Sequence, residues 1–409
     1  MSDDRAQDPS ARVPTGVELT ALDPIFRADP HPVLARLRER EPVHYDDVIK
    51  RWVLTRERDC ERVLRDRTMA VDPRKANEGT YIRLLAPPSG REPSMLMQDP
   101  PQHTRLRALV SKAFTPRAVE RLAPRIGEII DDLLTAVDGQ PRFDLIEALA
   151  VPLPLIVIAE MLGIDSADRA RFKRWSDLMS MSFNPRLTDA QRSALDDGHR
   201  ELGEYLGRVI AERRASPRAD LISDLIAAED NGDRLTDGEM VSLCGLLLVA
   251  GNATTTDLIG NGVWTLLRHP DQMEKLRARP SLIGRAIEEI LRFEPPVVQT
   301  ARIATGDVQI DGCPIRRGES VLLSLIAANR DPDVYPDPHR FDVIREDVHH
   351  HSFGGGAHFC LGAPLARLEA TLAIAAVMRR FPRLRLAEEA LEWRAYPSLR
   401  GLTRLHVLV

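Results

Sequence analysis

Cysteine is scarce in this chain of 409 residues, which contains only Cys60, Cys244, Cys313 and Cys360. The four are scattered and none forms a CxxC pair, so the sequence argues against a disulfide framework and against a zinc site. Long uncharged apolar runs are also missing. No segment reaches membrane-spanning length without charged residues, and the N-terminus is polar and acidic. We therefore expect a cytoplasmic protein that does not bind or span a membrane.

The chain also lacks an excess of basic residues and lacks a flexible linker. Its 56 lysines and arginines stand against 61 aspartates and glutamates, and the net charge of -5 argues against bulk nucleic-acid binding. No Gly/Ser-rich or proline-rich stretch divides the sequence, and 43% of the residues are hydrophobic, which suffices for a large core. We predict a single domain over residues 1–409, with residues 1–24 as a poorly ordered lead-in.

The most informative stretch is a glycine-rich loop followed by a helical pattern, over residues 353–381. The loop delivers Cys360 to the start of the helix, where unpaired backbone N–H groups and the helix dipole favour thiolate over thiol. We expect Cys360 to be an anion. Taken alone, the residues permit a buried structural cysteine, a phosphate cradle, or a nucleophile with His358 as its base. A structural cysteine leaves the glycines before it unexplained, and the phosphate pattern is weak.

The loop resembles the haem-thiolate signature of the cytochrome P450 family, FxxGxxxCxG, with Phe353, Gly356, Cys360 and Gly362 at the defined positions. The resemblance implies that the Cys360 sulfur is the metal ligand, binding the iron of a haem b. It also implies that Phe353 shields the sulfur from water and that Gly354 and Gly356 let the loop turn beneath the porphyrin. Gly362 would let the helix approach the ring.

A second stretch, residues 99–122, predicts a helix that carries His103 and Arg107 four residues apart. Both side chains can reach one anionic target, although a solvated polar face is the ordinary interpretation of such a pair. The stretch resembles the helix that lies beside the haem edge in the same family. The resemblance implies that His103, Arg107, Arg302 and His358 bind the haem propionates.

Residues 235–268 form the longest uninterrupted helical pattern, and within it Gly251, Asn252, Thr254 and Thr255 form a cluster of glycine and polar residues. A threonine inside a helix can bond the carbonyl four residues earlier and bend it, so a packing notch explains the cluster by itself. The string is similar to the oxygen-binding groove of the family, AGx[DE]TT. The resemblance implies that these residues form the catalytic groove and that Thr254 donates a hydrogen bond to the oxygen bound there.

The groove departs from the family pattern at Ala253, where the family has an acid that is assigned to proton relay. The proton route is therefore open. Asn252, Thr255 or ordered water are candidate substitutes, and Asp257 lies one turn further along the helix. The missing acid also motivates the alternative of a peroxide-using haem enzyme.

Two further patterns complete the resemblance. Glu289 and Arg292 match the family's ExxR pair, and Arg340 in PHRFD matches the arginine that completes it; we predict a structural brace under the cysteine loop. The histidines at 349–351 indicate a solvated loop more than a metal tract.

Apolar side chains are expected to line the substrate pocket. The residues that the resemblance places there are Leu96, Leu246, Val249, Ala250, Val297, Val298 and Leu399.

Electrons are expected from a separate ferredoxin or flavodoxin with its reductase. Arg105, Lys112 and Arg367 are candidates for the docking patch, and ordinary solvated charge is the alternative interpretation of each. The fold implied is mainly α with small β-sheets, the helical prism of a cytochrome P450 that encloses the haem. The activity implied is a monooxygenase that inserts one oxygen atom from O2 into a hydrophobic small molecule. A haem-based ligand-binding or sensor protein is the alternative from another class.

Overall fold

The computed structural model describes residues 13–87, 93–112, 114–181, 187–228 and 232–409. The α-helices are α1 (Pro24–Ala28), α2 (His31–Arg40), α3 (Glu57–Arg65), α4 (Gln102–Ser111), α5 (Pro116–Glu120), α6 (Ala123–Thr135), α7 (Pro152–Met161), α8 (Arg169–Ser180), α9 (Asp189–Ala215), α10 (Leu221–Ala227), α11 (Asp237–Arg268), α12 (Pro270–Ala278), α13 (Ile283–Phe293), α14 (Leu325–Ala328) and α15 (Ala363–Arg380). The strands are β1 (Val43–Asp46), β2 (Arg51–Leu54), β3 (Met69–Ala70), β4 (Arg142–Asp144), β5 (Gln299–Ala304), β6 (Val308–Ile310), β7 (Cys313–Ile315), β8 (Ser320–Ser324), β9 (Arg385–Leu386) and β10 (His406–Leu408).

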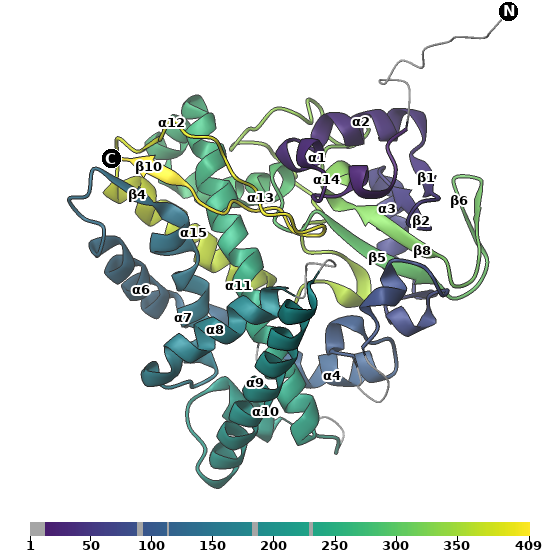
Figure 1. Cartoon of the computed structure of the whole chain (residues 1–409). Coiled ribbons are helices and arrows are strands. Elements are labelled where there is room, and N and C mark those ends of the chain that lie inside the picture. The colour runs from purple at the N-terminus through teal and green to yellow at the C-terminus, as the bar shows by residue number, and fades with distance from the viewer. Residues whose placement is uncertain (1–12, 88–92, 113, 182–186, 229–231) are drawn as a thin grey trace, which may run out of the picture.

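The prediction of a mainly helical fold with small sheets is confirmed. The largest sheet has the order β1-β2-β8-β5-β3, in which β2 and β8 run parallel and the other neighbours antiparallel. It joins the N-terminal part of the chain to strands from the last third. Figure 1 shows this sheet on one side of the molecule and most of the helices on the other, with α11 running between them. A second sheet, β4-β10-β9, holds the C-terminus against the helical side.

Helix α11 is the central element of the helical side. Its first turn is a capping box, in which the Glu239 N–H donates to Thr236 Oγ1 and the Thr236 N–H donates to the Glu239 carboxylate. By length and composition α11 is apolar enough to cross a membrane, but most of it is buried inside the protein. It packs against α7, α9, α13 and α15. Its hydrophobicity is therefore that of a core helix.

The segment 1–24, predicted to be a poorly ordered lead-in, is described in its second half. Residues 1–12 lie outside the described part of the chain, whereas residues 13–24 are folded onto β1. Asp46 at the end of β1 accepts hydrogen bonds from Thr15 Oγ1 (2.6 Å) and from the Gly16 N–H (3.0 Å). Leu19 is buried in a cluster with Phe26 of α1 and Val53 of β2. This apolar contact, which composition alone does not reveal, orders the segment.

Candidate functional site

The cysteine loop is folded back on itself and rests on α3. Gly354 and Gly356 have φ values of +70° and +63°, which glycine adopts without strain, so the predicted turn is present. A Cβ atom at Gly356 would lie 2.2 Å from the Leu64 carbonyl oxygen, so only glycine fits there. The Cys360 N–H donates to the Phe353 carbonyl (2.9 Å). The loop therefore has one conformation and places the sulfur just before α15.

Opposing effects act on the charge of the Cys360 sulfur, which we expect to be an anion. Burial is the largest influence and raises the pKa of Cys360. The N–H groups of Gly362 and Ala363 and the positive charges of Arg107 and Arg367 oppose burial without overcoming it. The helix terminus thus prepares the sulfur for negative charge, and a cation bound to the sulfur is needed to complete the deprotonation.

Four basic side chains predicted to bind propionates do come together. The rings of His103 and His358 stack with centroids 4.0 Å apart, and Arg107 donates to the Phe359 carbonyl (2.7 Å). Arg302 is 5% exposed, and burial lowers the pKa of Arg302 to about 10. Burial, followed by the charges of His103 and Arg302, lowers the pKa of His358 to about 3. Positive charge is concentrated here in a poorly solvated place.

This basic cluster, defined as His103, Arg107, Arg302 and His358, is left without an anion. Among the described residues no carboxylate forms an ion pair with either arginine, and His103 Nδ1 is buried without a hydrogen-bond partner. Asp99 is the carboxylate whose charge acts on Arg302 and His358, and it is already bound to Lys75 and to backbone N–H groups. Buried charges are normally paired. The cluster therefore fits a ligand that carries carboxylates, as a haem does.

One face of α11 is open in the middle of the helix. Leu246, Ala250 and Thr254 lie one turn apart and are partly or fully exposed. Thr254 Oγ1 donates to the Ala250 carbonyl (2.7 Å), the bond to the preceding turn that the sequence allows. A Cβ atom at Gly251 or at Gly362 would meet no atom within 4 Å. Both glycines therefore border open space, which a flat cofactor between α11 and α15 would fill.

The other polar residues of the predicted groove point elsewhere. The Asn252 amide donates to Ser176 of α8 (2.6 Å), which ties the two helices together and removes Asn252 from the groove. Asp257 forms a buried ion pair with Arg394 of the C-terminal segment. Thr255 is buried. A helix turns by 100° per residue, so near neighbours of Thr254 in sequence face other elements.

The brace under the cysteine loop exists, but with a different second arginine. Arg292 binds both oxygens of Glu289 (2.7 and 2.8 Å), as predicted. The other arginine on Glu289 is Arg345 (3.2 Å), whereas the Arg340 side chain is 61% exposed beside Asp342. Arg340 contributes its carbonyl oxygen, which accepts from Arg292 and Arg345. The chain turns outward at Arg340 and returns five residues later, which the PHRFD string does not reveal.

The predicted pocket residues are only partly brought together. Val298 packs into the N-terminal cluster with Phe26, which corrects its assignment to the substrate pocket. Leu399 is buried and forms a β-bridge with Val297. Leu96, in a 3₁₀-helix at Met95–Met97, is 52% exposed. Val249 is partly buried on α11. Val297 packs against a different hydrophobic cluster from Val298, so these two neighbours do not share one set of contacts.

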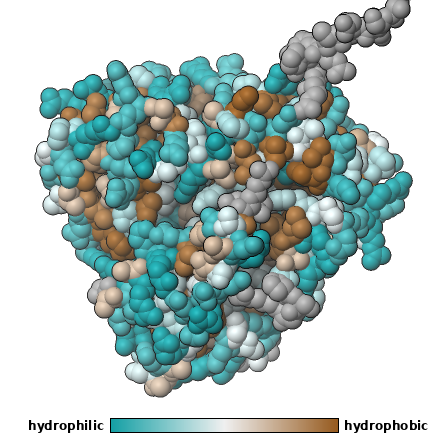
Figure 2. Space-filling view, in the orientation of Figure 1, coloured by the Kyte–Doolittle hydropathy of each residue, from teal (hydrophilic) through white to brown (hydrophobic). Residues whose placement is uncertain are grey.

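The docking candidates Arg105 and Arg367 both form ion pairs within the protein. Arg105 binds Glu239 and Asp233 near the start of α11. Arg367 binds both oxygens of Glu288 (2.6 and 2.8 Å). Although burial opposes the charged form, the hydrogen bonds from Arg367 and His350 lower the pKa of Glu288 to about 2. These ion pairs give both arginines a role in holding the fold together. Figure 2 shows that hydrophilic side chains cover most of the visible surface, with separate hydrophobic patches among them.

Comparison with known proteins agrees with this geometry. A family model described as "Cytochrome P450" matches residues 50–279 and 281–393. Cytochrome P450 107B1 of Saccharopolyspora erythraea is 43% identical over 95% of this chain and 97% of its own. The cytochrome P450 monooxygenase PikC of Streptomyces venezuelae is 41% identical over 98% of this chain and 96% of its own. The solved structure of PksS from Bacillus subtilis superposes with a TM-score of 0.88 at 38% identity, covering 95% and 98% of the two chains.

PikC is named a monooxygenase, and a further relative of Saccharopolyspora erythraea, 39% identical, is named 6-deoxyerythronolide B hydroxylase; these names do not favour a peroxide-using enzyme or a sensor. The match extends over nearly all of this chain and of each relative, which leaves no doubt about common descent. The chain therefore belongs to the cytochrome P450 family and is a haem-thiolate monooxygenase, which binds haem b through a cysteine thiolate, oxidises a hydrophobic substrate and receives its electrons from a redox partner.

Proposed function

We propose that Cys360 is the thiolate ligand and that the basic cluster binds the haem propionates. The other three cysteines are unsuited to the role. Cys60 and Cys244 are fully buried in α3 and α11, and burial raises the pKa of Cys244 to about 12. Cys313 lies in the peripheral two-stranded sheet β6-β7. Cys360 alone combines a helix N-terminus with nearby Arg107, and this combination supports the proposal.

When bound, the haem supplies the activation of O2 and delivers one oxygen atom to the substrate. The chain supplies the surroundings. Leu246 and Ala250 on the open face of α11 form an apolar wall, which excludes water and favours a hydrophobic substrate. Thr254 donates its one hydroxyl proton to the Ala250 carbonyl and keeps acceptor capacity on its oxygen, so it can accept a hydrogen bond from a water and hold that water at the open face of α11. With Ala253 buried in place of the acid, we propose that water supplies the protons.

The substrate class we infer is a bulky, neutral, hydrophobic molecule, and the reaction is hydroxylation. Relatives of comparable identity bear the names 6-deoxyerythronolide B hydroxylase and vitamin D(3) 25-hydroxylase. One solved relative, 33% identical, was crystallised with testosterone. The predicted pocket residues on α11 carry no charge, which agrees with such a substrate. A screen of neutral polyketides, sterols and fatty acids for spin-state shifts tests this inference. A preference for fatty acids would contradict it.

We further propose a single domain over residues 1–409 in the cytoplasm, reduced by a ferredoxin or flavodoxin. Phe359, directly before the ligand residue, is 42% exposed, and an exposed aromatic side chain beside the sulfur supports docking on this side. Phe359→Ser should slow reduction by the redox protein but not by dithionite. Equal slowing with both reductants would contradict the docking role.

The ligand assignment is tested by the carbon-monoxide spectrum of the reduced, haem-supplied protein. Thiolate ligation gives a strongly red-shifted band, and we expect this band in the wild type and in Cys313→Ser. Cys360→Ser should abolish it. An unchanged band in Cys360→Ser, or its loss in Cys313→Ser alone, would overturn the assignment.

A further inference from the structure

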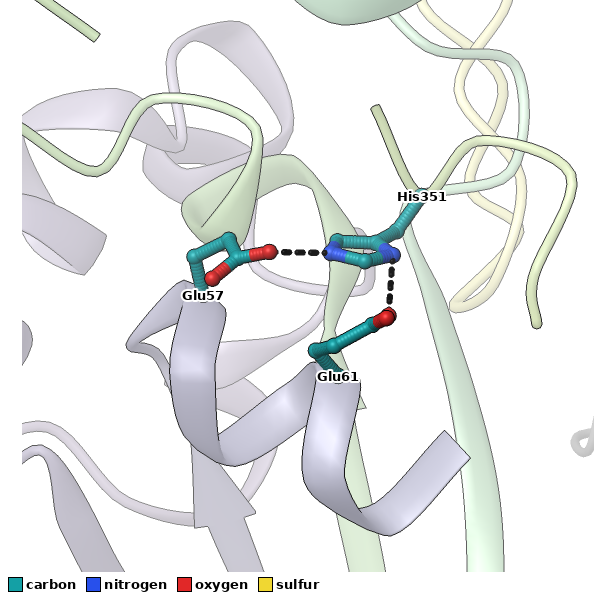
Figure 3. A group of neighbouring side chains, drawn as sticks. All are labelled: Glu57, Glu61 and His351. Carbon is teal, nitrogen blue, oxygen red and sulfur yellow. Dashed lines mark hydrogen bonds and ion pairs between the residues drawn. The ribbon is translucent and has the colours of Figure 1, made fainter. Parts of the chain in front are cut away.

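Three side chains outside the haem surroundings form a compact cluster between α3 and the start of the cysteine loop (Figure 3). Glu57 and Glu61 lie one turn apart on α3, and the His351 ring lies between them. His351 Nε2 is 3.0 Å from Glu57 Oε1, and Nδ1 is 3.5 Å from Glu61 Oε2. The histidine is 8% exposed. The interpretation of residues 349–351 as a solvated loop is therefore wrong at His351.

The backbone of His351 is fixed as firmly as its ring. Its N–H donates to Asn329 Oδ1 (2.8 Å), and its carbonyl accepts from the Gly354 N–H (2.8 Å), which closes a tight turn. Phe353 lies inside this turn, and its carbonyl accepts the hydrogen bond from the Cys360 N–H. A continuous path of contacts thus leads from α3 through His351 to the residue that carries the sulfur.

Helix α3 meets the loop a second time at its other end. Cβ atoms at Gly355 and Gly356 would lie 3.1 Å from Leu64 Cβ and 2.2 Å from the Leu64 carbonyl oxygen. The Glu57 N–H donates to Asp331 Oδ2 (2.8 Å), which anchors the first turn of α3. The helix is therefore a fixed support, against which the loop is held at its front by His351 and at its glycines by Leu64.

We propose that His351 is a positioning residue for the Cys360 sulfur, and that its contacts with Glu57 and Glu61 hold the front of the loop on α3. The proposal rests on the assignment of Cys360 as the thiolate ligand. The contact between His351 Nε2 and Glu57 is a hydrogen bond to a charged group, which is stronger than a neutral one, and the partly buried site reduces its screening by water. We call these contacts of His351 with Glu57 and Glu61 the clasp. Without the clasp, the turn at 351–354 should open and the Cys360 sulfur should move from its position.

A divalent cation is the other occupant that these ligand types suggest, since their atoms all lie within 4.8 Å of one another. The geometry favours direct contact instead. Each ring nitrogen already faces a different carboxylate, whereas a metal would require one nitrogen and both carboxylates to converge on one point. Chelation of metals separates the two possibilities.

The test compares His351→Ala with His349→Ala, a matched control at an exposed histidine two residues away. In the haem-loaded protein, His351→Ala should lose its red-shifted carbon-monoxide band about tenfold faster than the wild type. Amide hydrogens of residues 351–362 should exchange faster by a similar factor. His349→Ala should match the wild type in both measurements, and equality of the two variants would overturn the proposal.

The carboxylates provide variants that keep the histidine. Glu57→Gln should have a larger effect than Glu61→Gln, because its contact is shorter and Glu61 also pairs with Arg65. Adding Glu57→Gln to His351→Ala should change little, since the shared contact is already lost. Additive effects would contradict the clasp. If His351→Ala takes up no haem, the two glutamine variants decide by the same measurements.

Two further outcomes keep the inference separate from its premise. A wild-type protein without the red-shifted band disproves the Cys360 assignment, whereas a normal wild type with an unaffected His351→Ala disproves the clasp alone. A metal chelator should leave band stability unchanged. A loss on chelation that added Zn²⁺ restores would replace the direct contact with a metal site.

Discussion

Two buried clusters of charge lie near the cysteine loop, and they differ in one respect. In the brace, Glu289 receives Arg292, Arg345 and the Asp342 N–H, and the remaining donors of Arg292 bind backbone carbonyls. In the basic cluster no carboxylate pairs with Arg107 or Arg302 among the described residues, and His103 Nδ1 has no partner. A buried charge that the protein neutralises is structural; one left unpaired indicates a missing ligand. The difference separates the two roles without reference to sequence motifs.

Removing the carboxylate from the brace should have the largest effect on stability. Glu289→Gln leaves two arginines facing a neutral amide, and breaking a buried pair by removing one partner costs about 3–5 kcal/mol. We expect a large loss of soluble, haem-loaded protein and a much lower unfolding temperature. Near-normal stability in calorimetry or denaturant titration would show that the brace is not the rigid support described here.

The choice between Arg345 and Arg340 sharpens the same comparison. Arg345→Ala removes the contact with Glu289 and donors to the carbonyls of Pro336 and Arg340, so we expect a loss of about 2 kcal/mol. Arg340→Ala removes an exposed side chain and keeps the carbonyl that matters, so the loss should be below about 0.5 kcal/mol. Denaturant titration of the two variants measures the difference. The reverse order would restore the assignment made from the PHRFD string.

In the basic cluster, removing an arginine should stabilise the haem-free protein but weaken the binding of haem. Arg302→Leu removes a buried charge without a carboxylate partner, so the haem-free protein should become more stable by about 1 kcal/mol. With haem the same substitution should speed haem loss about tenfold, because a charge-assisted bond to a propionate is lost. Haem transfer to an excess of a scavenging apoprotein measures the rate. Arg302→Lys, which keeps the charge, is the control. Its rate of haem loss should lie between those of the wild type and of Arg302→Leu.

The sequence predicted the elements well where local signals are strong. The Thr236 and Glu239 capping box marks the start of α11, and the prolines after Glu294 mark the end of α13. The cysteine loop and the four basic residues were found because the spacing of the motifs is specific. Predictions failed where a side chain's direction depends on distant packing. Asn252 faces Ser176 of another helix, and Arg345 takes the place expected for Arg340. Nothing local in the sequence marks His351 as buried.

The charge of the Cys360 sulfur is hard to predict from sequence for a different reason, because two opposing effects have to be weighed. Backbone N–H groups at a helix start are visible in a sequence pattern, whereas the depth of burial that opposes them depends on the whole fold. The same holds for Arg302. Its place in the strand β5 is local information, but the absence of a carboxylate partner becomes visible only when all neighbours are placed.

The stability of the haem-free protein should also depend on pH. Burial and the neighbouring positive charges lower the pKa of His358 from 6.5 to about 3 in the folded state. The unfolded chain therefore binds the proton more readily between these values, and stability falls as pH is lowered from about 6.5 toward 3. His31, whose pKa burial lowers to about 4, contributes in the same direction, so His358→Phe should flatten the profile only in part.

With haem bound, propionates beside His358 offset the positive charges, and the profile of the loaded protein should be flatter than that of the haem-free one. Urea titrations at a series of pH values measure both. An equal slope with and without haem would mean that no anion reaches the cluster, which would place the propionates elsewhere.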